Sequence, residues 1–118
     1  MHFNLERDAI CAVSTPPGIG GVAVVRMTGK DSLSIAQKIC VGLPQFVVER
    51  HMYLTKLVSS DDGNAFDEAL VCFFSEGRSY TGDETVEFFC HGGQMICHML
   101  VSELVHLGCR VARPGEFT

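Results

Sequence analysis

Two ionisable side chains interrupt stretches of sequence that are otherwise apolar. Arg26 follows the apolar run 22–25, and Glu87 lies inside the run 85–90, among Val and Phe residues. A carboxylate with such neighbours is costly to bury unless a donor satisfies it, and a guanidinium can hold a carboxylate or stack on a ring. We therefore single out Arg26 and Glu87 as candidate binding residues. The alternative is that both are solvated, Glu87 at a sheet edge and Arg26 with its head group in water.

His91 and the cysteines near it are the other residues that could do chemistry. His91 precedes two glycines, and histidine titrates near neutral pH, so it could be a general base. No Ser or Cys nucleophile stands in an elbow motif beside it, and a hydrogen bond to a local turn is the commoner role. The pairs Cys90-His91 and Cys97-His98 have metal-ligand types, but adjacent residues point in different directions and no C-x-x-C is present. We predict neither a catalytic residue nor a metal site.

The loop 14–21 contains two prolines and three glycines. With the next two residues, it satisfies the G-x-G-x-x-G/A pattern of dinucleotide-binding turns. That function needs a helix N-terminus directly after the loop, to hold a pyrophosphate. The β-branched run 22–25 predicts a strand there instead. We therefore expect a turn between strands. A Rossmann-like nucleotide binder stays as an alternative, which a helix after Gly21 would support and a strand would exclude.

Composition limits the class of protein. The chain has 118 residues, 47% hydrophobic content and a net charge of −5, which suits one compact domain and argues against this chain alone gripping nucleic acid. It shows no secretory signal and no apolar run of about 18 residues, so we expect no membrane association. Its six cysteines fall mostly in apolar patterns. We expect them to be reduced and the protein to be cytoplasmic.

Periodicity predicts six strands and two helices. The expected strands cover residues 8–14, 21–27, 51–57, 68–74, 85–90 and 109–112. The helices cover about 31–40, capped by Asp31 or Ser32, and 94–107, ended by Gly108. The second helix is expected to bury a stripe of Met95, Ile96, Met99, Leu100, Leu104 and Leu107. This order predicts an α+β fold with a single mixed sheet and two main helices packed on it.

Motifs spread along the chain resemble one known family. They are Asp8-Ala9-Ile10, Thr15-Pro16-Pro17-Gly18-x-Gly20-Gly21-Val22, Arg26, Gly29, Asp67-Glu68, Ser79-Tyr80-Thr81-Gly82-Asp83, Glu87, His91-Gly92-Gly93, Leu107-Gly108 and Arg113-Pro114-Gly115-Glu116-Phe117-Thr118. Together they resemble the N-terminal domain of the tRNA-modification GTPase family called MnmE or TrmE. Each motif is weak by itself, but the set follows the family's order over almost the whole chain. The loop departs from the family at Ile19, where a polar residue is common.

The resemblance implies a function and a fold. It implies a domain, here residues 1–118, that binds a tetrahydrofolate of the 5-formyltetrahydrofolate type and mediates homodimerisation. The fold is then similar to the folate-binding domain of glycine-cleavage aminomethyltransferase. In the family, a helical domain and a GTP-binding domain follow. With a flavin-dependent partner protein, the full-length GTPase modifies carbon 5 of the tRNA wobble uridine. A ligand-free dimerisation module is the alternative.

Carried over by matching position, Arg26 and Glu87 become the folate contacts. We expect the strand after the Pro/Gly loop to bring Arg26 towards Glu87 on a neighbouring strand. A further ligand-contacting Lys of the family would lie beyond Thr118. The phosphate loop is absent, so GTP, Mg2+ and K+ belong to the full-length protein only, and this fragment is expected to be non-catalytic. The chain stops in a helix-capping context, and we expect it to be an excised domain.

Overall fold

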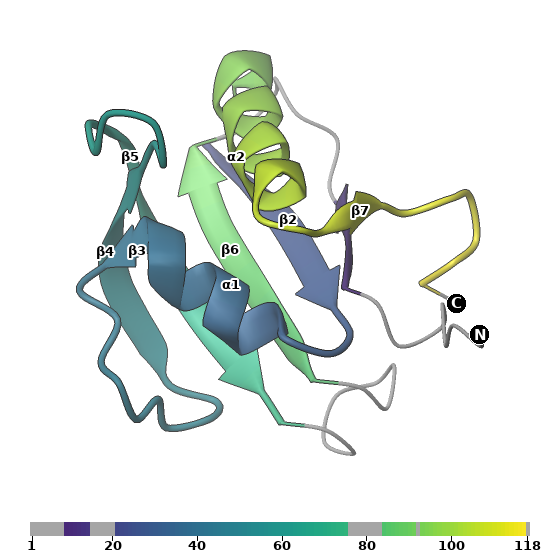
Figure 1. The fold of residues 1–118 in the computed structure, drawn as a ribbon, viewed down its shortest axis with the longest axis horizontal. Coiled ribbons are helices and arrows are strands. Elements are labelled where there is room, and N and C mark those ends of the chain that lie inside the picture. Colours follow the sequence, from purple (N-terminus) through teal and green to yellow (C-terminus); the bar gives the residue numbers. More distant parts are fainter. Residues whose placement is uncertain (1–8, 15–20, 76–83, 92, 118) are drawn as a thin grey trace.

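The computed structural model describes residues 9–14, 21–75, 84–91 and 93–117. Within them, one mixed sheet carries two helices (Figure 1). In chain order the elements are β1 (Ile10–Val13), β2 (Val22–Thr28), α1 (Ser32–Ile39), β3 (Cys40–Val41), β4 (Met52–Val58), β5 (Ala65–Phe74), β6 (Thr85–His91), α2 (Gln94–His106) and β7 (Arg110–Val111). The predicted α+β class is confirmed. The likeness to the aminomethyltransferase domain stays a prediction.

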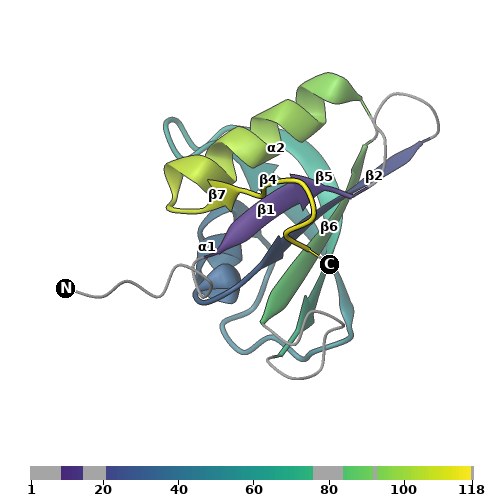
Figure 2. The ribbon, with the colours of Figure 1, turned by 90° about the vertical axis from the view of Figure 1, so that its right-hand side faces the viewer.

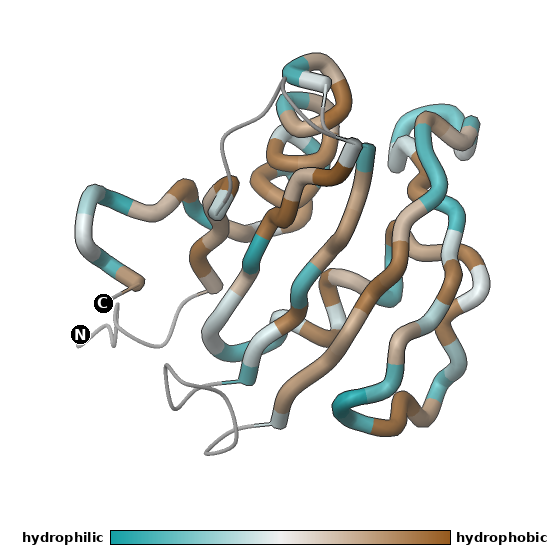
Figure 3. Tube along the Cα trace, turned by 180° about the vertical axis from the view of Figure 1, so that it is seen from behind, coloured by the Kyte–Doolittle hydropathy of each residue, from teal (hydrophilic) through white to brown (hydrophobic). Residues whose placement is uncertain are grey.

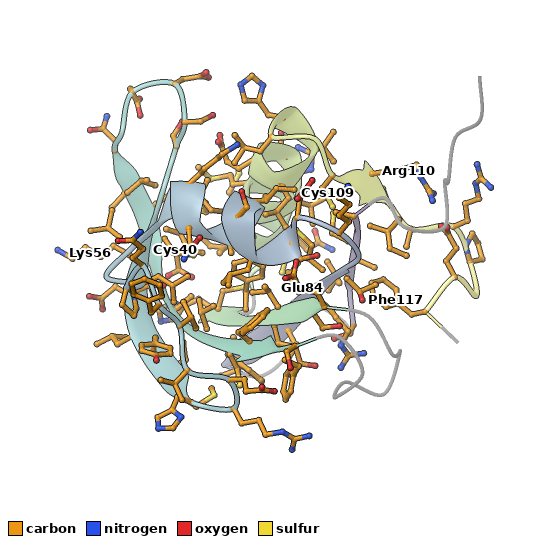
Figure 4. The ribbon with its side chains drawn as sticks, turned by 60° about the horizontal axis from the view of Figure 1, so that its bottom comes forward. Cys40, Lys56, Glu84, Cys109, Arg110 and Phe117 are labelled. Carbon is orange, nitrogen blue, oxygen red and sulfur yellow. The ribbon has the colours of Figure 1, made fainter. Side chains whose placement is uncertain are left out.

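The strands lie in the order β3-β4-β5-β6-β2-β1-β7. Neighbours pair antiparallel except β1 and β7, which are parallel. Lys56 of β4 and Arg110 of β7 therefore stand towards opposite edges of the sheet, with Phe117 on the Arg110 side (Figure 4). The centre consists of the long strands β5, β6 and β2. Strand β2 begins directly after Gly21, so the strand expected there is present, whereas residues 15–20 of the loop lie outside the described residues.

Both helices cover the same face of the sheet (Figures 1 and 2). α1 contacts β3, β4 and β6, while α2 contacts β1, β2, β6 and β7. Strand alternation sends every second side chain into this layer. The buried sheet residues of the two central strands are Ala23, Val25, Met27, Val86, Phe88 and Cys90. This leaves the other face of the sheet without a covering helix among the described residues.

The first helix differs from prediction at both ends. Cys40 is not helical but begins the two-residue strand β3 and pairs with Leu57. Neither expected cap is made: Asp31 is left-handed (φ 71°) without a side-chain cap bond, and the Ser32 hydroxyl donates backwards to the Gly29 carbonyl. Glu84, which is distant in sequence, accepts from the Leu33 N–H at 3.4 Å and lies beside the start of α1 (Figure 4). A carboxylate there suits the positive end of the helix dipole.

The second helix follows prediction more closely. It ends at His106, and Gly108 takes the expected left-handed conformation with φ 113°. Its buried residues are Cys97, Leu100 and Leu104, at helical spacing. Met95 was wrongly placed in the buried stripe, since it is 69% exposed. It lies two positions before Cys97, which turns it away from the sheet.

The six cysteines lie in the interior of the domain. All six are buried free thiols, as expected. In the part of the chain that the structure describes, no group of three or more His, Cys, Asp or Glu side chains is arranged to hold a metal ion. No helix formed by these residues has the length and apolar character needed to cross a bilayer.

Candidate binding site on the open face of the sheet

The face of the sheet that the helices leave uncovered, called here the open face, is turned to the viewer in Figure 3. Register determines which side chains meet on it, because residues directly opposite on paired strands point to the same side. One row across five strands contains Ala12, Arg26, Glu87, Cys72 and Met52. The row on one side contains Val24, Phe89, Leu70 and Leu54.

Arg26 and Glu87 are direct cross-strand partners at the centre of the open face. The guanidinium donates to one carboxylate oxygen, Oε2, from Nε at 2.8 Å and from Nη2 at 2.7 Å. Both side chains are mostly buried, with 20% and 15% of their surface exposed. Oε1 takes no part in these two contacts. The expectation that β2 brings Arg26 to Glu87 on a neighbouring strand is confirmed.

The surroundings of the pair differ on its two sides. On one side, Thr28 and Thr85 share a hydrogen bond of 2.9 Å between their hydroxyls. On the other side the apolar row begins with Val24 and Phe89, which are half-buried. Next to Glu87 on β5, burial and then the Glu87 charge raise the pKa of the Cys72 thiol. The open face therefore offers a charged, hydrogen-bonding centre beside a flat apolar surface.

Large apolar side chains stand exposed on the same face. Leu54 is 66% exposed, and Met52, Leu70 and Val22 are also well exposed. Single exposed apolar residues are ordinary, but several that adjoin one another on one sheet face mark a surface for a ligand or a partner. The open face is thus a candidate binding surface in its composition as well as in its geometry.

At the end of β6, the structure provides a partner that sequence reasoning missed. Asp67 of β5 accepts the His91 main-chain N–H through Oδ2 at 3.0 Å, and its Oδ1 meets His91 Nδ1 at 2.5 Å. In place of the local-turn hydrogen bond named as the commoner role, His91 has a carboxylate partner on the neighbouring strand. The two residues are 24 positions apart, and no local pattern links them. Only the pairing of β5 with β6 brings them together.

The fold and this face define a class of protein. It is a mixed-sheet α+β domain with one helix-covered face and one open face that carries a buried Arg–Glu pair. A strand, not a helix, follows Gly21, so the Rossmann-like alternative is excluded by the criterion set for it. This fold has no helix N-terminus directly after Gly21, where a dinucleotide would need one.

Comparison with known proteins identifies the family. The family described as GTP-binding protein TrmE N-terminus matches residues 9–118. The chain is 45% identical over 118 residues to the tRNA modification GTPase MnmE of Bdellovibrio bacteriovorus, covering 100% of the chain and 25% of that protein. It is 38% identical over 117 residues to MnmE of Fervidobacterium nodosum (98% and 26% covered) and 39% over 118 residues to that of a Nitratiruptor species (100% and 25%). The chain belongs to the TrmE N-terminal family, and it spans about a quarter of the length of these relatives.

Proposed function

We propose that this chain is the folate-binding and dimerising domain of a tRNA-modifying GTPase, and that its ligand is a tetrahydrofolate of the 5-formyltetrahydrofolate type. One observation carries the proposal: a paired arginine and glutamate, mostly buried, at the centre of a sheet face that no described helix covers. Membership of the TrmE N-terminal family supports it.

The residues of the open face suit the chemistry of a reduced folate. The pterin ring presents an edge of N–H donors, which a carboxylate can accept in pairs. Glu87 supplies that carboxylate, and Arg26 orients it while Oε1 stays outside their two contacts. The apolar side chains of Val24 and Phe89 lie in the adjacent row, where a ring can pack. When bound, the folate would supply the one-carbon unit. The chain's own part is to bind and orient it.

Dimerisation is the second part of the proposal. A monomer in water would leave Leu54, Leu70 and Met52 of the open face exposed. A second copy that packs against this face would remove them from water and would also enclose a ligand lying on it. This accounts for both properties with one surface.

The remaining activities belong to the longer protein. We propose that GTP hydrolysis with Mg2+ and K+ takes place in a GTP-binding domain outside these residues. The full-length protein then acts in the cytoplasm with a flavin-dependent partner at carbon 5 of the wobble uridine of tRNA. The relatives are named as tRNA modification GTPases, and the present chain corresponds to about a quarter of each.

Isothermal titration of the full-length protein with 5-formyltetrahydrofolate tests the folate proposal. The wild type should bind saturably, and Glu87→Gln should weaken binding at least tenfold, because a neutral amide loses a charge-assisted hydrogen bond of about 1.5–3 kcal/mol. Glu116→Gln is the matched control, since it removes the carboxylate of another Arg–Glu pair, with Arg110 of the edge strand β7. Absence of saturable heat with wild-type protein would refute folate binding.

The ligand-free dimerisation module is favoured by a different observation, the exposed apolar residues themselves. Sedimentation of wild type and Leu54→Glu separates it from the leading proposal. Both proposals expect a wild-type dimer that the charge at Leu54 weakens, because Leu54 is 66% exposed and a dimer would bury it. Only the leading proposal expects folate to strengthen that dimer. A wild-type monomer at high concentration would refute dimerisation in either form.

A further inference from the structure

The Asp67–His91 pair has the form of an oriented imidazole. Asp67 is 7% exposed, whereas the His91 side chain is 71% exposed. The carboxylate is thus fixed inside the domain while the ring projects from it. Because Asp67 Oδ1 accepts from Nδ1–H, the neutral ring has its basic lone pair on Nε2. No hydrogen bond from another described residue reaches Nε2.

A purely structural role for Asp67 would need only one of its two hydrogen bonds to His91, the one to the main-chain N–H. Main-chain pairing of β5 with β6 ends at Leu70 and Phe89, which leaves the His91 N–H beyond the ladder. Asp67 Oδ2 satisfies that N–H. This bond would form with any residue at position 91. The second contact, to the ring, is specific to histidine and fixes its tautomer and direction.

The pair lies on the same strands as the proposed folate site. Register places His91 opposite Val22 and Glu87 opposite Arg26, four residues along each strand. His91 and Glu87 share a face of β6, about 13 Å apart along the strand at the usual rise per residue. Val24 and Phe89 lie between them. The open face therefore carries a strip with the charged pair at one end, an apolar floor, and His91 at the end of β6. Asp67 lies opposite the buried Leu57, so it meets the His91 ring from the helix-covered side.

We propose that His91 is the proton-transfer residue of this site, with Asp67 as its positioning residue, and this rests on the proposed folate function. A folate bound with its N–H edge at Glu87 would extend along the strip towards His91. One-carbon chemistry changes the protonation of the nitrogen that carries the carbon. The lone pair of that nitrogen takes the proton from Nε2–H of the imidazolium, the Nε2–H bond breaks with its electron pair left on the ring, and a hydronium ion from solvent then restores the proton.

Among the described residues, the charged groups on the strands beside His91 provide controls. Asp67 is in contact, and Glu68 and Lys56 continue the outer row of the same face as cross-strand partners. Both are exposed, so solvent screens their effect on the ring. A pH dependence that disappears in His91→Gln but persists in Glu68→Gln therefore belongs to the imidazole.

The test uses the full-length protein with its flavin-dependent partner and tRNA, in single-turnover modification assays. His91→Ala and His91→Gln should lower the rate about 100-fold, and added imidazole should restore part of the loss in His91→Ala, whose cavity is open to solvent. His98→Ala, an exposed histidine on α2, should keep the wild-type rate. Asp67→Asn should lower the rate by less than His91→Ala does.

Two measurements besides activity separate the possible outcomes. Isothermal titration should give 5-formyltetrahydrofolate the wild-type affinity in His91→Gln, because that variant leaves the Arg26–Glu87 end intact. Nitrogen-15 spectra should show the His91 ring as the Nδ1-protonated tautomer in the wild type and not in Asp67→Asn. Absence of folate binding by the wild-type protein would refute the proposed function itself. A wild-type rate in His91→Gln, or a loss in His91→Ala that imidazole leaves unchanged, would overturn the proton-transfer role.

Discussion

Replacing the Arg26–Glu87 pair by apolar residues should leave the fold intact and abolish folate binding. The perturbation is the double variant Arg26→Met/Glu87→Leu, compared with each single variant. Partners of similar volume without charge need no desolvation, and replacing a buried ion pair in this way is often neutral or stabilising. Removing one member instead leaves the other charge mostly buried without its partner.

The geometry sets the size of the effect. Breaking a fully buried pair costs about 3–5 kcal/mol, and an exposed pair contributes about 0.2–1 kcal/mol. Arg26 and Glu87 retain 20% and 15% exposure, so they fall between these limits. We expect Glu87→Leu alone to lose about 2 kcal/mol, which corresponds to a melting temperature lower by roughly 8 °C in a domain of this size. The double variant should lie within about 1 kcal/mol of wild type.

Urea unfolding followed by circular dichroism measures the free energy of unfolding of the wild type, the two single variants and the double variant. Titration with 5-formyltetrahydrofolate measures the folate affinity of the same four proteins. A double variant less stable than both single variants would show that the pair stabilises the sheet, which would refute the desolvation argument. A stable double variant that still binds folate with wild-type affinity would remove Arg26 and Glu87 from the site. The expected result, stability kept and binding lost, would show that the pair serves ligand recognition.

Three further predictions concern the rest of the chain. Gly108→Ala should lower the free energy of unfolding by about 1–2 kcal/mol, because a φ of 113° is strained for any L side chain even where the space is open. Gly21 has equally open space and is not left-handed, so Gly21→Ala should leave the free energy of unfolding unchanged in the same urea assay. The Arg110 guanidinium lowers the pKa of Glu116 to about 2. The hydrogen bonds between Arg110 and Glu116 should therefore be fully present above the ordinary carboxyl pKa of 4.5 and be lost as the pH falls towards 2. Amide exchange should show this pH dependence in the wild type and not in Glu116→Gln. Burial raises the pKa of Cys40 to about 12, so this thiol should resist a disulfide reagent at pH 8 until denaturant is added; rapid modification of Cys40 in the native protein would contradict its burial.

Much of this architecture is accessible from the sequence because it depends on local periodicity. The apolar runs 22–25 and 85–90 correctly predicted strands that the structure shows as β2 and β6. All six predicted strands and both helices are present, with ends displaced by at most three residues, as at the start of β5. The left-handed conformation of Gly108 was also predictable, since it depends only on the helix before it.

The features that escaped prediction all depend on contacts distant in sequence. Strand β3 contains two residues, too few for any periodicity, and exists because Cys40 pairs with Leu57. The first helix receives a carboxylate from Glu84, 51 residues from Leu33, while the expected local caps are not made. Asp67 reaches His91 across 24 positions. In each case a local signal was absent or pointed to a nearby partner, and the sheet's register decided the outcome.

The chain's two described Arg–Glu pairs show how different roles leave different geometry. Arg110 and Glu116 are six residues apart and form a fork, with Nη1 on Oε1 at 2.9 Å and Nη2 on Oε2 at 2.7 Å. Both carboxylate oxygens are used, so the pair closes a local turn and has little left to offer a ligand. Arg26 and Glu87 are 61 residues apart, and both guanidinium contacts converge on Oε2. A pair selected to join two strands would gain more from the fork. The convergent form leaves Oε1 outside these two contacts, and this is the oxygen that would accept from the proposed folate.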